Sequence, residues 1–314
     1  MRGRRAVGAA LLAALVGLSG VNASGRDPAP GSEVLVIAHG VSITAPRPLV
    51  PRAELPRGGT AILGHFRVVG YYGAAGTGAL GVLGATSPDT AAAAITRRAA
   101  GFAGYGLPVQ PTMELLATVA QRSPGPGGDY SKPVPAWRIR QYLAVAHAHR
   151  MLLVLDLQPG RASFLSQAQA LRPFLLDPSV SLALDPEWKV GPTQVPGGGL
   201  IGSSSADGIN DVSRWLGRLI AANHLPDKLL VVHQFTERML PDRTRIVRPA
   251  NVEVTFHADG FGTPTLKVRV YQRLAFPGRP YGAGFKLFLK QDSRLMTPRE
   301  VMSLRPRPDV VTYQ

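Results

Sequence analysis

The sequence predicts an α/β protein of the (β/α)8 barrel class, the TIM barrel. Three observations lead to this prediction. Apolar segments of strand length alternate with amphipathic segments of helix length, which is typical of parallel strands joined by helical crossovers. Eight strand segments fit into about 250 residues, the usual size of such a barrel. The chain ends on the eighth segment, which can close against the first without a further helix. An open, doubly wound sheet is the alternative arrangement.

The strands are predicted from runs of apolar, aromatic and β-branched residues. Met151–Leu157 (MLLVLDL) is apolar almost throughout, as expected of a strand buried on both faces. Pro111 is expected to break the second strand, because proline donates no ladder hydrogen bond. In chain order the predicted strands are Arg67–Tyr72, one within Leu107–Val119, Met151–Leu157, Val180–Glu187, Leu229–Phe235, Val252–His257, Phe285–Leu289 and Asp309–Tyr313.

The helices are predicted from capping residues and from apolar residues at helical spacing. Pro133–Arg150 has proline in its first turn and apolar Ile139, Leu143 and Ala146 on one face. Thr297 is an N-cap candidate followed by a proline. The predicted helices are Asp89–Phe102, Pro133–Arg150, Phe164–Leu176, Ile209–Asn223, Pro264–Leu274 and Thr297–Leu304.

The N-terminal region predicts export. Three arginines precede an apolar run, Ala6–Leu18, which is too short for a comfortable membrane span, and Val21-Asn22-Ala23 suits a signal-peptidase site. We therefore expect a signal peptide at residues 1–23, a Pro/Gly-rich linker or arm at 24–64 and the barrel domain at 65–314. The protein is expected to be secreted or associated with a bacterial cell envelope.

Composition limits the chemistry. The chain has no cysteine, which excludes disulfides and thiol catalysis and argues against a structural zinc site. Its formal net charge is +15, so a polysaccharide or another anionic envelope polymer is the expected partner. The basic residues are scattered, with no stripe or stacking motif for nucleic acid. No cofactor is expected.

The segment VSLALDPEW, at residues 180–188, carries the strongest chemical signal. Asp185 and Glu187 stand two positions apart, and residues i and i+2 of a strand share a face. Two neighbouring carboxylates repel each other, which raises one pKa and prepares a general acid for neutral pH. Trp188 beside them offers a platform for a sugar ring.

Other candidate residues stand at the predicted strand ends, where TIM barrels have their active sites. The further catalytic candidates are Asp156 and Asp259. The candidate substrate-binding residues are Tyr71, Tyr72, Trp188, His233, Gln234, His257 and Tyr313.

Each candidate also has a structural interpretation. Asp156 can pair with Arg161, and His233 and His257 can be satisfied core histidines. Asp259 lies in His-Ala-Asp-Gly-Phe-Gly, which suits a turn. Tyr71 and Tyr72 can pack the barrel mouth, and Lys290 with Asp292 is expected to form a solvated turn.

Asp185-Pro186-Glu187, ending the fourth strand of an eight-unit barrel, resembles chitinase-like glycoside hydrolases, whose fourth strand ends in D-x-E with the glutamate as general acid. The fuller D-G-x-D-x-D-x-E pattern is absent, since Leu182-Ala183-Leu184 precedes Asp185. The resemblance implies a glycoside hydrolase in which Glu187 is the acid and Asp185 tunes its pKa. Asp156 or Asp259 would then be the nucleophile or base.

Two other functions remain open from the sequence. A non-catalytic barrel that binds cell wall or carbohydrate would keep the aromatic residues and the positive charge. A metal-dependent hydrolase would use Asp156, His233, His257 and Asp259 as ligands, although the chain has no H-x-H or H-E-x-x-H motif.

Overall fold

The computed structural model describes residues 34–36, 42–44, 50–276 and 280–314 of the chain. The chain divides into two compact units, Met1–Val50 and Pro51–Gln314. In the first unit, β1 (Val34–Val36) pairs antiparallel with β2 (Ser42–Thr44). The predicted signal peptide lies outside the described residues. Across the described part of the chain, no helix combines the length and hydropathy needed to span a bilayer.

The second unit contains a closed barrel of eight parallel strands, which confirms the predicted (β/α)8 class. Neighbouring strands pair in parallel around the whole ring, and the last strand closes against the first. The strands are β3 (Arg67–Gly73), β4 (Val109–Ala120), β6 (Leu152–Leu157), β7 (Val180–Leu184), β8 (Lys228–Gln234), β9 (Val252–Ala258), β10 (Gly282–Leu287) and β11 (Val310–Tyr313). A short strand, β5 (Ser131–Pro133), pairs antiparallel with the end of β4.

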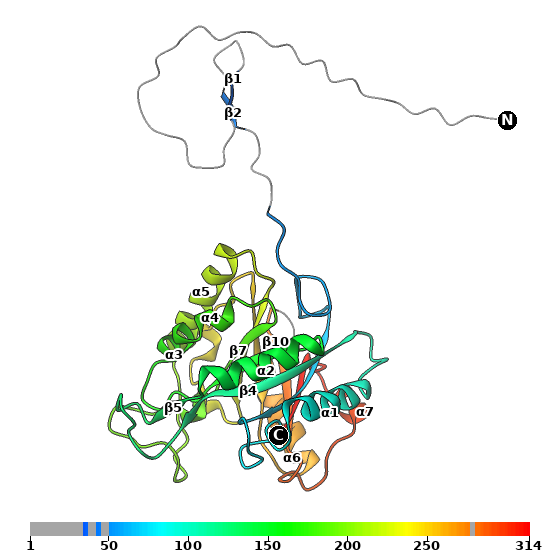
Figure 1. Cartoon of the computed structure of the whole chain (residues 1–314). Helices are drawn as coiled ribbons and strands as arrows, with labels where there is room; N and C mark the ends of the chain where they lie inside the picture. The colour runs from blue at the N-terminus through cyan, green and yellow to red at the C-terminus, as the bar shows by residue number, and fades with distance from the viewer. Residues whose placement is uncertain (1–33, 37–41, 45–49, 277–279) are drawn as a thin grey trace, which may run out of the picture. The chain divides into compact units, whose positions relative to one another are not determined.

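The helices lie outside the ring, with α3, α4 and α5 on one flank in Figure 1 and α1 and α7 on the other. Serine or threonine side chains cap most of their N-termini, including the predicted cap at Thr297. The helices are α1 (Pro88–Ala100), α2 (Ala136–Ala148), α3 (Phe164–Ala170), α4 (Arg172–Leu175), α5 (Ala206–Ala222), α6 (Pro264–Leu274) and α7 (Pro298–Met302). The single helix expected at residues 164–176 is divided at Leu171, just before Pro173, which has no N–H to continue it.

The strands β4 and β10 differ from their predicted form, and β7 ends earlier than predicted. β4 continues through Pro111, which pairs with Val69 of β3 and precedes the ladder with β6 that begins at Thr112. The missing N–H of Pro111 therefore costs no hydrogen bond between β4 and β6. β10 begins at Gly282, three positions earlier than the apolar run at Phe285 indicates, because glycine and alanine open it.

The glycine-rich segment after β3 contains Gly76-Thr77-Gly78-Ala79-Leu80-Gly81, which has the G-x-G-x-x-G spacing of dinucleotide-binding turns. In those turns the glycines lead directly into a helix whose N-terminus meets the phosphates. Here α1 begins only at Pro88, and the sheet is a closed ring. The segment is therefore a loop over the barrel mouth and not a Rossmann turn.

Residues 51–66 close the amino-terminal end of the barrel. Leu55, Ile62 and Leu63 are buried in an apolar cluster with the first halves of several strands. The backbone N–H groups of Ile62 and Leu63 donate to the buried carboxylate of Glu253 at 3.0 and 2.6 Å. The barrel unit thus begins at Pro51, earlier than the boundary at residue 65 that the Pro/Gly-rich composition indicates.

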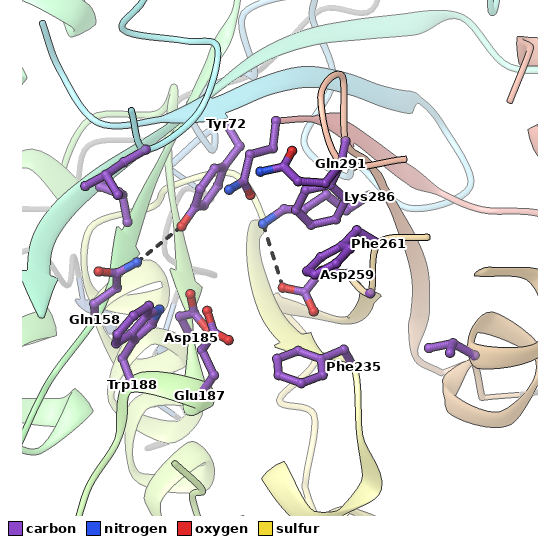
Figure 2. Close-up of a pocket in the computed structure, with 16 residues that line it drawn as sticks. Tyr72, Gln158, Asp185, Glu187, Trp188, Phe235, Asp259, Phe261, Lys286 and Gln291 are labelled. Atoms are coloured by element: carbon purple, nitrogen blue, oxygen red, sulfur yellow. Dashed lines mark hydrogen bonds and ion pairs between the residues drawn. The ribbon is translucent and has the colours of Figure 1, made fainter. Parts of the chain in front are cut away.

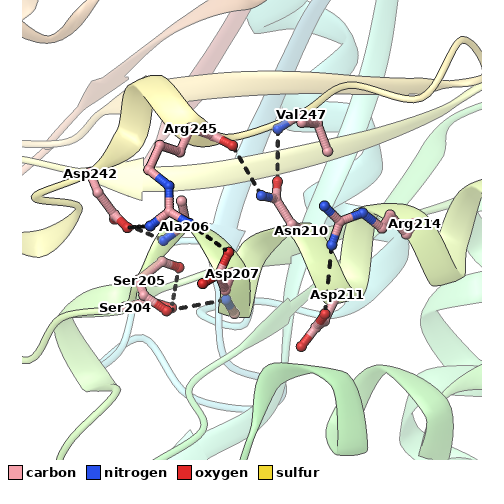
Figure 3. Close-up of polar contacts among 11 residues, drawn as sticks. Ser204, Ser205, Ala206, Asp207, Asn210, Asp211, Arg214, Asp242, Arg245 and Val247 are labelled. Atoms are coloured by element: carbon pink, nitrogen blue, oxygen red, sulfur yellow. Dashed lines mark hydrogen bonds and ion pairs between the residues drawn. The ribbon is translucent and has the colours of Figure 1, made fainter.

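A polar cluster attaches the β8–β9 loop to the start of α5 (Figure 3). The Asn210 side chain donates to the Arg245 carbonyl at 3.0 Å and accepts from the Val247 N–H at 2.7 Å. Asp242 accepts from the Ala206 N–H at 2.8 Å. Asn210 is 2% exposed, so its two hydrogen bonds are shielded from water.

We expect Asn210→Ala to lower the free energy of unfolding by about 1–3 kcal/mol, because it leaves a loop N–H and a carbonyl without their partner. Urea denaturation monitored by circular dichroism measures the change. Asp211→Ala, one position along the same helix, removes an exposed carboxylate 3.9 Å from Arg214 and should cost about 0.5 kcal/mol or less. Equal losses in the two variants would contradict this role for Asn210.

Candidate active site

A cavity of about 460 Å³ opens at the carboxyl ends of the barrel strands, the end at which TIM barrels carry out their chemistry. Figure 2 shows Asp185, Glu187 and Trp188 on one side of it and Asp259, Phe235 and Phe261 on the other. Tyr72, Leu80, Leu116, Gln158, Gly260, Val270, Lys286, Phe288, Gln291 and Gln314 complete the lining.

Five of the residues singled out in the sequence line this cavity: Tyr72, Asp185, Glu187, Trp188 and Asp259. They come from β3, from the segment after β7 and from the residue after β9, so the barrel brings together positions more than 180 residues apart.

Three other candidates lie beneath the cavity, inside the barrel and shielded from solvent: Asp156, His233 and His257. The remaining candidates belong to the outer, helix-facing side of the strands. Tyr71 and Tyr313 pack edge to face at 6.2 Å, and the Arg98 guanidinium lies over the Tyr313 ring. The Gln234 amide accepts from Arg243. These three side chains do not line the cavity, because alternation along a strand turns each away from the barrel axis.

The two carboxylates after β7 reach the cavity by a different geometry from the one predicted. β7 ends at Leu184, and Pro186–Trp188 form a turn of 3-10 helix, so Asp185 and Glu187 are not strand neighbours at i and i+2. Pro186 explains the early end, since it has no N–H for the ladder. The turn still directs both carboxylates into the cavity.

These carboxylates hold protons unusually well. Burial raises the pKa of Glu187 to about 7, and the negative charge of Asp259 adds to the rise. Burial, then the charges of Glu187 and Asp156, raises the pKa of Asp185 well above its ordinary value. Glu187 is thus half-protonated near neutral pH, as a general acid requires.

Asp259 behaves in the opposite way. Burial acts to raise its pKa, but a hydrogen bond from His233 and the positive charge of Lys286 outweigh it and bring the pKa of Asp259 below its ordinary value. The His233 Nδ1 lies 3.2 Å and the Lys286 Nζ 3.7 Å from the same Asp259 oxygen. Asp259 is therefore ionised where Glu187 still carries a proton.

Asp156 lies below the lining and is fully buried. Burial raises its pKa to about 6, although the positive charge of His233 opposes the rise. Its suggested partner Arg161 instead donates to the Gln194 carbonyl and stacks on Tyr130. Since Asp156 is fully buried and Asp259 lines the cavity, Asp259 is the better placed second carboxylate.

His257 is a core histidine. Its Nε2 lies 2.8 Å from the Thr312 hydroxyl, and burial, followed by the charge of His233, lowers its pKa well below the ordinary value. The ring packs against Gly284 of β10, where a Cβ atom would come within 2.0 Å of the His257 Nδ1. Glycine at this position therefore makes room for a neutral imidazole.

Aromatic rings give the cavity an apolar wall. Phe261 and Phe288 pack edge to face at 5.8 Å, and Phe261 is 61% exposed. Trp188 lies beside the two carboxylates in Figure 2. An exposed ring over a carboxylate-lined cavity is suited to the apolar face of a sugar.

Lys286 and Phe288 were missed in the sequence because β10 was predicted to start three residues and to end two residues too late, which moved its end beyond them. The same shift produced the solvated turn expected at Lys290 and Asp292. Lys290 is exposed, but the Asp292 side chain is buried and pairs with Lys267 at 3.1 Å, so that expectation was wrong for Asp292.

Among the described residues, Glu114, Asp156 and His233 come nearest to a metal-binding set, with ligand atoms within 4.8 Å of one another. However, the His233 Nε2 lies only 2.7 Å from a Glu114 oxygen and its other nitrogen faces Asp259. An imidazole held by two carboxylates has no free nitrogen lone pair for a metal. We therefore interpret the group as an ion-pair network.

Comparisons with models of protein families, with curated proteins and with solved structures find no match to this chain.

Proposed function

We propose that the protein is a glycoside hydrolase that acts on an extracellular or cell-envelope polysaccharide. One observation carries the proposal. A carboxyl group that keeps its proton near pH 7, Glu187, shares a cavity with a carboxylate that loses its proton early, Asp259. Two carboxyl groups in opposite protonation states are what glycoside hydrolysis requires.

In this proposal Glu187 donates its proton to the glycosidic oxygen as the bond to the leaving sugar breaks. Asp259 acts from the opposite wall, either by attacking the anomeric carbon or by taking a proton from the attacking water. Burial and the negative charge of Asp259 keep Glu187 protonated, while Asp185 beside it holds its own proton because its pKa lies well above the ordinary value. The aromatic rings hold the sugar, and Gln158, Gln291 and Gln314 offer amide groups for its hydroxyls.

The charges of the lining favour a neutral polysaccharide. Asp185 and Glu187 hold protons near neutral pH, and Lys286, the one cation among the described lining residues, is already next to the ionised Asp259. The lining therefore has no cation left over to bind the charges of an acidic polymer. The net positive charge of the chain can attract anionic envelope polymers to the outer surface while the cavity accepts an uncharged chain.

The test is a reducing-end assay with purified protein and a panel of neutral polysaccharides, including chitin, β-glucans, α-glucans and mannans. An Asp259→Asn preparation controls for contaminating hydrolases. Release of reducing ends by the wild type and not by this variant supports the proposal. Binding to a polysaccharide without any release would favour the non-catalytic carbohydrate-binding barrel, and release that requires an added divalent metal would favour the metal-dependent hydrolase.

A second cavity of about 170 Å³ adjoins the first, since Gln291 and Gln314 line both. Its other wall is the glycine-rich loop, including Ala79. We expect Ala79→Trp to fill it and lower kcat/KM for a hexasaccharide roughly tenfold, equivalent to about 1.4 kcal/mol of lost binding. Activity on an aryl glycoside should not change.

Ala103→Trp places the same ring on an exposed residue that lines neither cavity, and it serves as the control. If long and short substrates respond equally to Ala79→Trp, the second cavity does not bind sugar.

A further inference from the structure

His233 is a buried histidine with a carboxylate on each side of its ring. Its Nε2 lies 2.7 Å from a Glu114 oxygen, and its Nδ1 lies 3.2 Å from an Asp259 oxygen. The side chain has no exposed area. A neutral imidazole has one N–H, and an ionised carboxylate can only accept a hydrogen bond. Two such hydrogen bonds therefore require a doubly protonated ring, unless one of the carboxyl groups carries the proton.

The surroundings decide where the proton resides. The titratable groups around His233 come from six of the other seven barrel strands: Tyr72 on β3, Glu114 on β4, Asp156 on β6, Asp185 and Glu187 after β7, His257 and Asp259 on or after β9, and Lys286 on β10. Two carboxyl groups, Glu114 and Asp259, lie against the two ring nitrogens, whereas Lys286 lies against Asp259, so a positive charge on the ring is favoured.

The individual effects on the imidazole oppose one another. Burial and the charge of Lys286 act to lower the pKa of His233. The charge of Glu114 and the hydrogen bonds to Asp259 and Glu114 outweigh them, so the pKa of His233 lies well above its ordinary value. His257, whose ring centroid is 5.1 Å away, is neutral and does not compete for the charge.

We propose that His233 is a positioning residue: a permanently charged imidazolium that bridges Glu114 to Asp259 and holds Asp259 ionised and oriented toward the cavity. This inference rests on the proposed hydrolase function, in which Asp259 is the second carboxylate. His233 itself touches no substrate, because it lies below the residues that line the cavity. It acts through Asp259, which it links to Glu114 on the opposite side of the barrel. Glu114 precedes His233 by 119 positions along the chain.

The charge state is tested directly by NMR. In long-range ¹H–¹⁵N correlation spectra of the ¹⁵N-labelled wild-type protein, we expect the His233 ring to show two protonated nitrogens from pH 5 to pH 9. Of the seven histidines, the other six are assigned by comparison with single variants, and His233 is then assigned by elimination. A neutral tautomer at pH 8 would overturn the inference. So would a divalent metal bound stoichiometrically to the purified protein and lost in His233→Gln.

The positioning role is tested by the pH profile of His233→Gln. Glutamine can donate one hydrogen bond to Asp259 but carries no charge, so the pKa of Asp259 should rise. Because Asp259 must be ionised to act, the acid limb of kcat/KM should move to higher pH by at least one unit, which is about a tenfold loss on the acid side. The basic limb, set by Glu187, should move less, because burial, Asp259 and Lys286 all affect the pKa of Glu187 more than His233 does.

His257→Gln is the matched control: it is the same substitution at the neighbouring buried histidine, and the acid limb should not move. An unmoved limb in His233→Gln would refute the positioning role even if the wild type hydrolyses polysaccharide. If the wild type hydrolyses nothing, the proposed function fails, while the NMR experiment still decides the charge of His233 and needs no folded variant at this position.

Discussion

Replacing Glu187 by glutamine is expected to lower kcat on the hydrolysed polysaccharide by about 10²- to 10⁴-fold, the usual contribution of general acid catalysis. Glutamine has nearly the same shape but no proton to give to the leaving oxygen. The fold should be unchanged, because the change removes a carboxyl group whose ionisation burial already opposes. Reducing-end kinetics and circular dichroism measure the two effects.

The same proton sets the pH dependence of the wild type. Glu187 must be protonated to act as the acid, so kcat should be high below pH 7 and fall as the pH rises through its pKa of about 7. Glu54→Gln is the control, because Glu54 is exposed and far from the cavity lining. Full activity in Glu187→Gln would exclude Glu187 as the acid.

Replacing Lys267 by methionine should destabilise the protein by about 3–5 kcal/mol, the usual cost of removing one partner from a buried ion pair. Lys267 and Asp292 lie 3.1 Å apart, and each side chain is only 1% exposed. The Lys267 ammonium also donates to the carbonyls of Gly260 and Lys286 at 2.8 and 2.9 Å. Methionine fills similar volume but leaves the Asp292 charge buried without its counter-ion.

Urea denaturation measures this loss, with Lys290→Met as the matched control on an exposed lysine. A loss below about 1 kcal/mol in Lys267→Met would mean that Asp292 is satisfied by its other contacts, the N–H groups of Gly262 and Phe288 at 3.0 and 2.9 Å.

The sequence predicted the barrel because its strands are short apolar runs separated by capped helices, signals that depend on nearby residues alone. The same local signals located Asp185, Glu187 and Asp259 at the cavity, since the ends of parallel strands meet at one end of a barrel. The sequence alone could not show that Tyr72, and not Tyr71, points into the barrel. Side chains alternate along a strand, so the inward-facing residues are known only once one of them has been placed.

The role of His233 could not be predicted at all. Its partners Glu114 and Asp259 come from different strands, and only the closing of the ring brings Glu114 across to it. Lys286 was missed for a simpler reason, since the glycine and alanine that begin β10 have no strand signal of their own. Contacts between residues far apart in the chain, and strand ends without apolar or β-branched residues, therefore could not be predicted from this sequence.

The two ends of the barrel differ in a way that matters for handling the protein. Pro51–Phe66 cover the amino-terminal end, whereas Gln314 forms part of the cavity wall. A purification tag or fluorescent protein fused after Gln314 would begin at the wall of the cavity and obstruct it. One attached ahead of residue 51 joins the barrel unit at the opposite end. Attachment to a resin or a sensor surface is therefore best made through the N-terminal side.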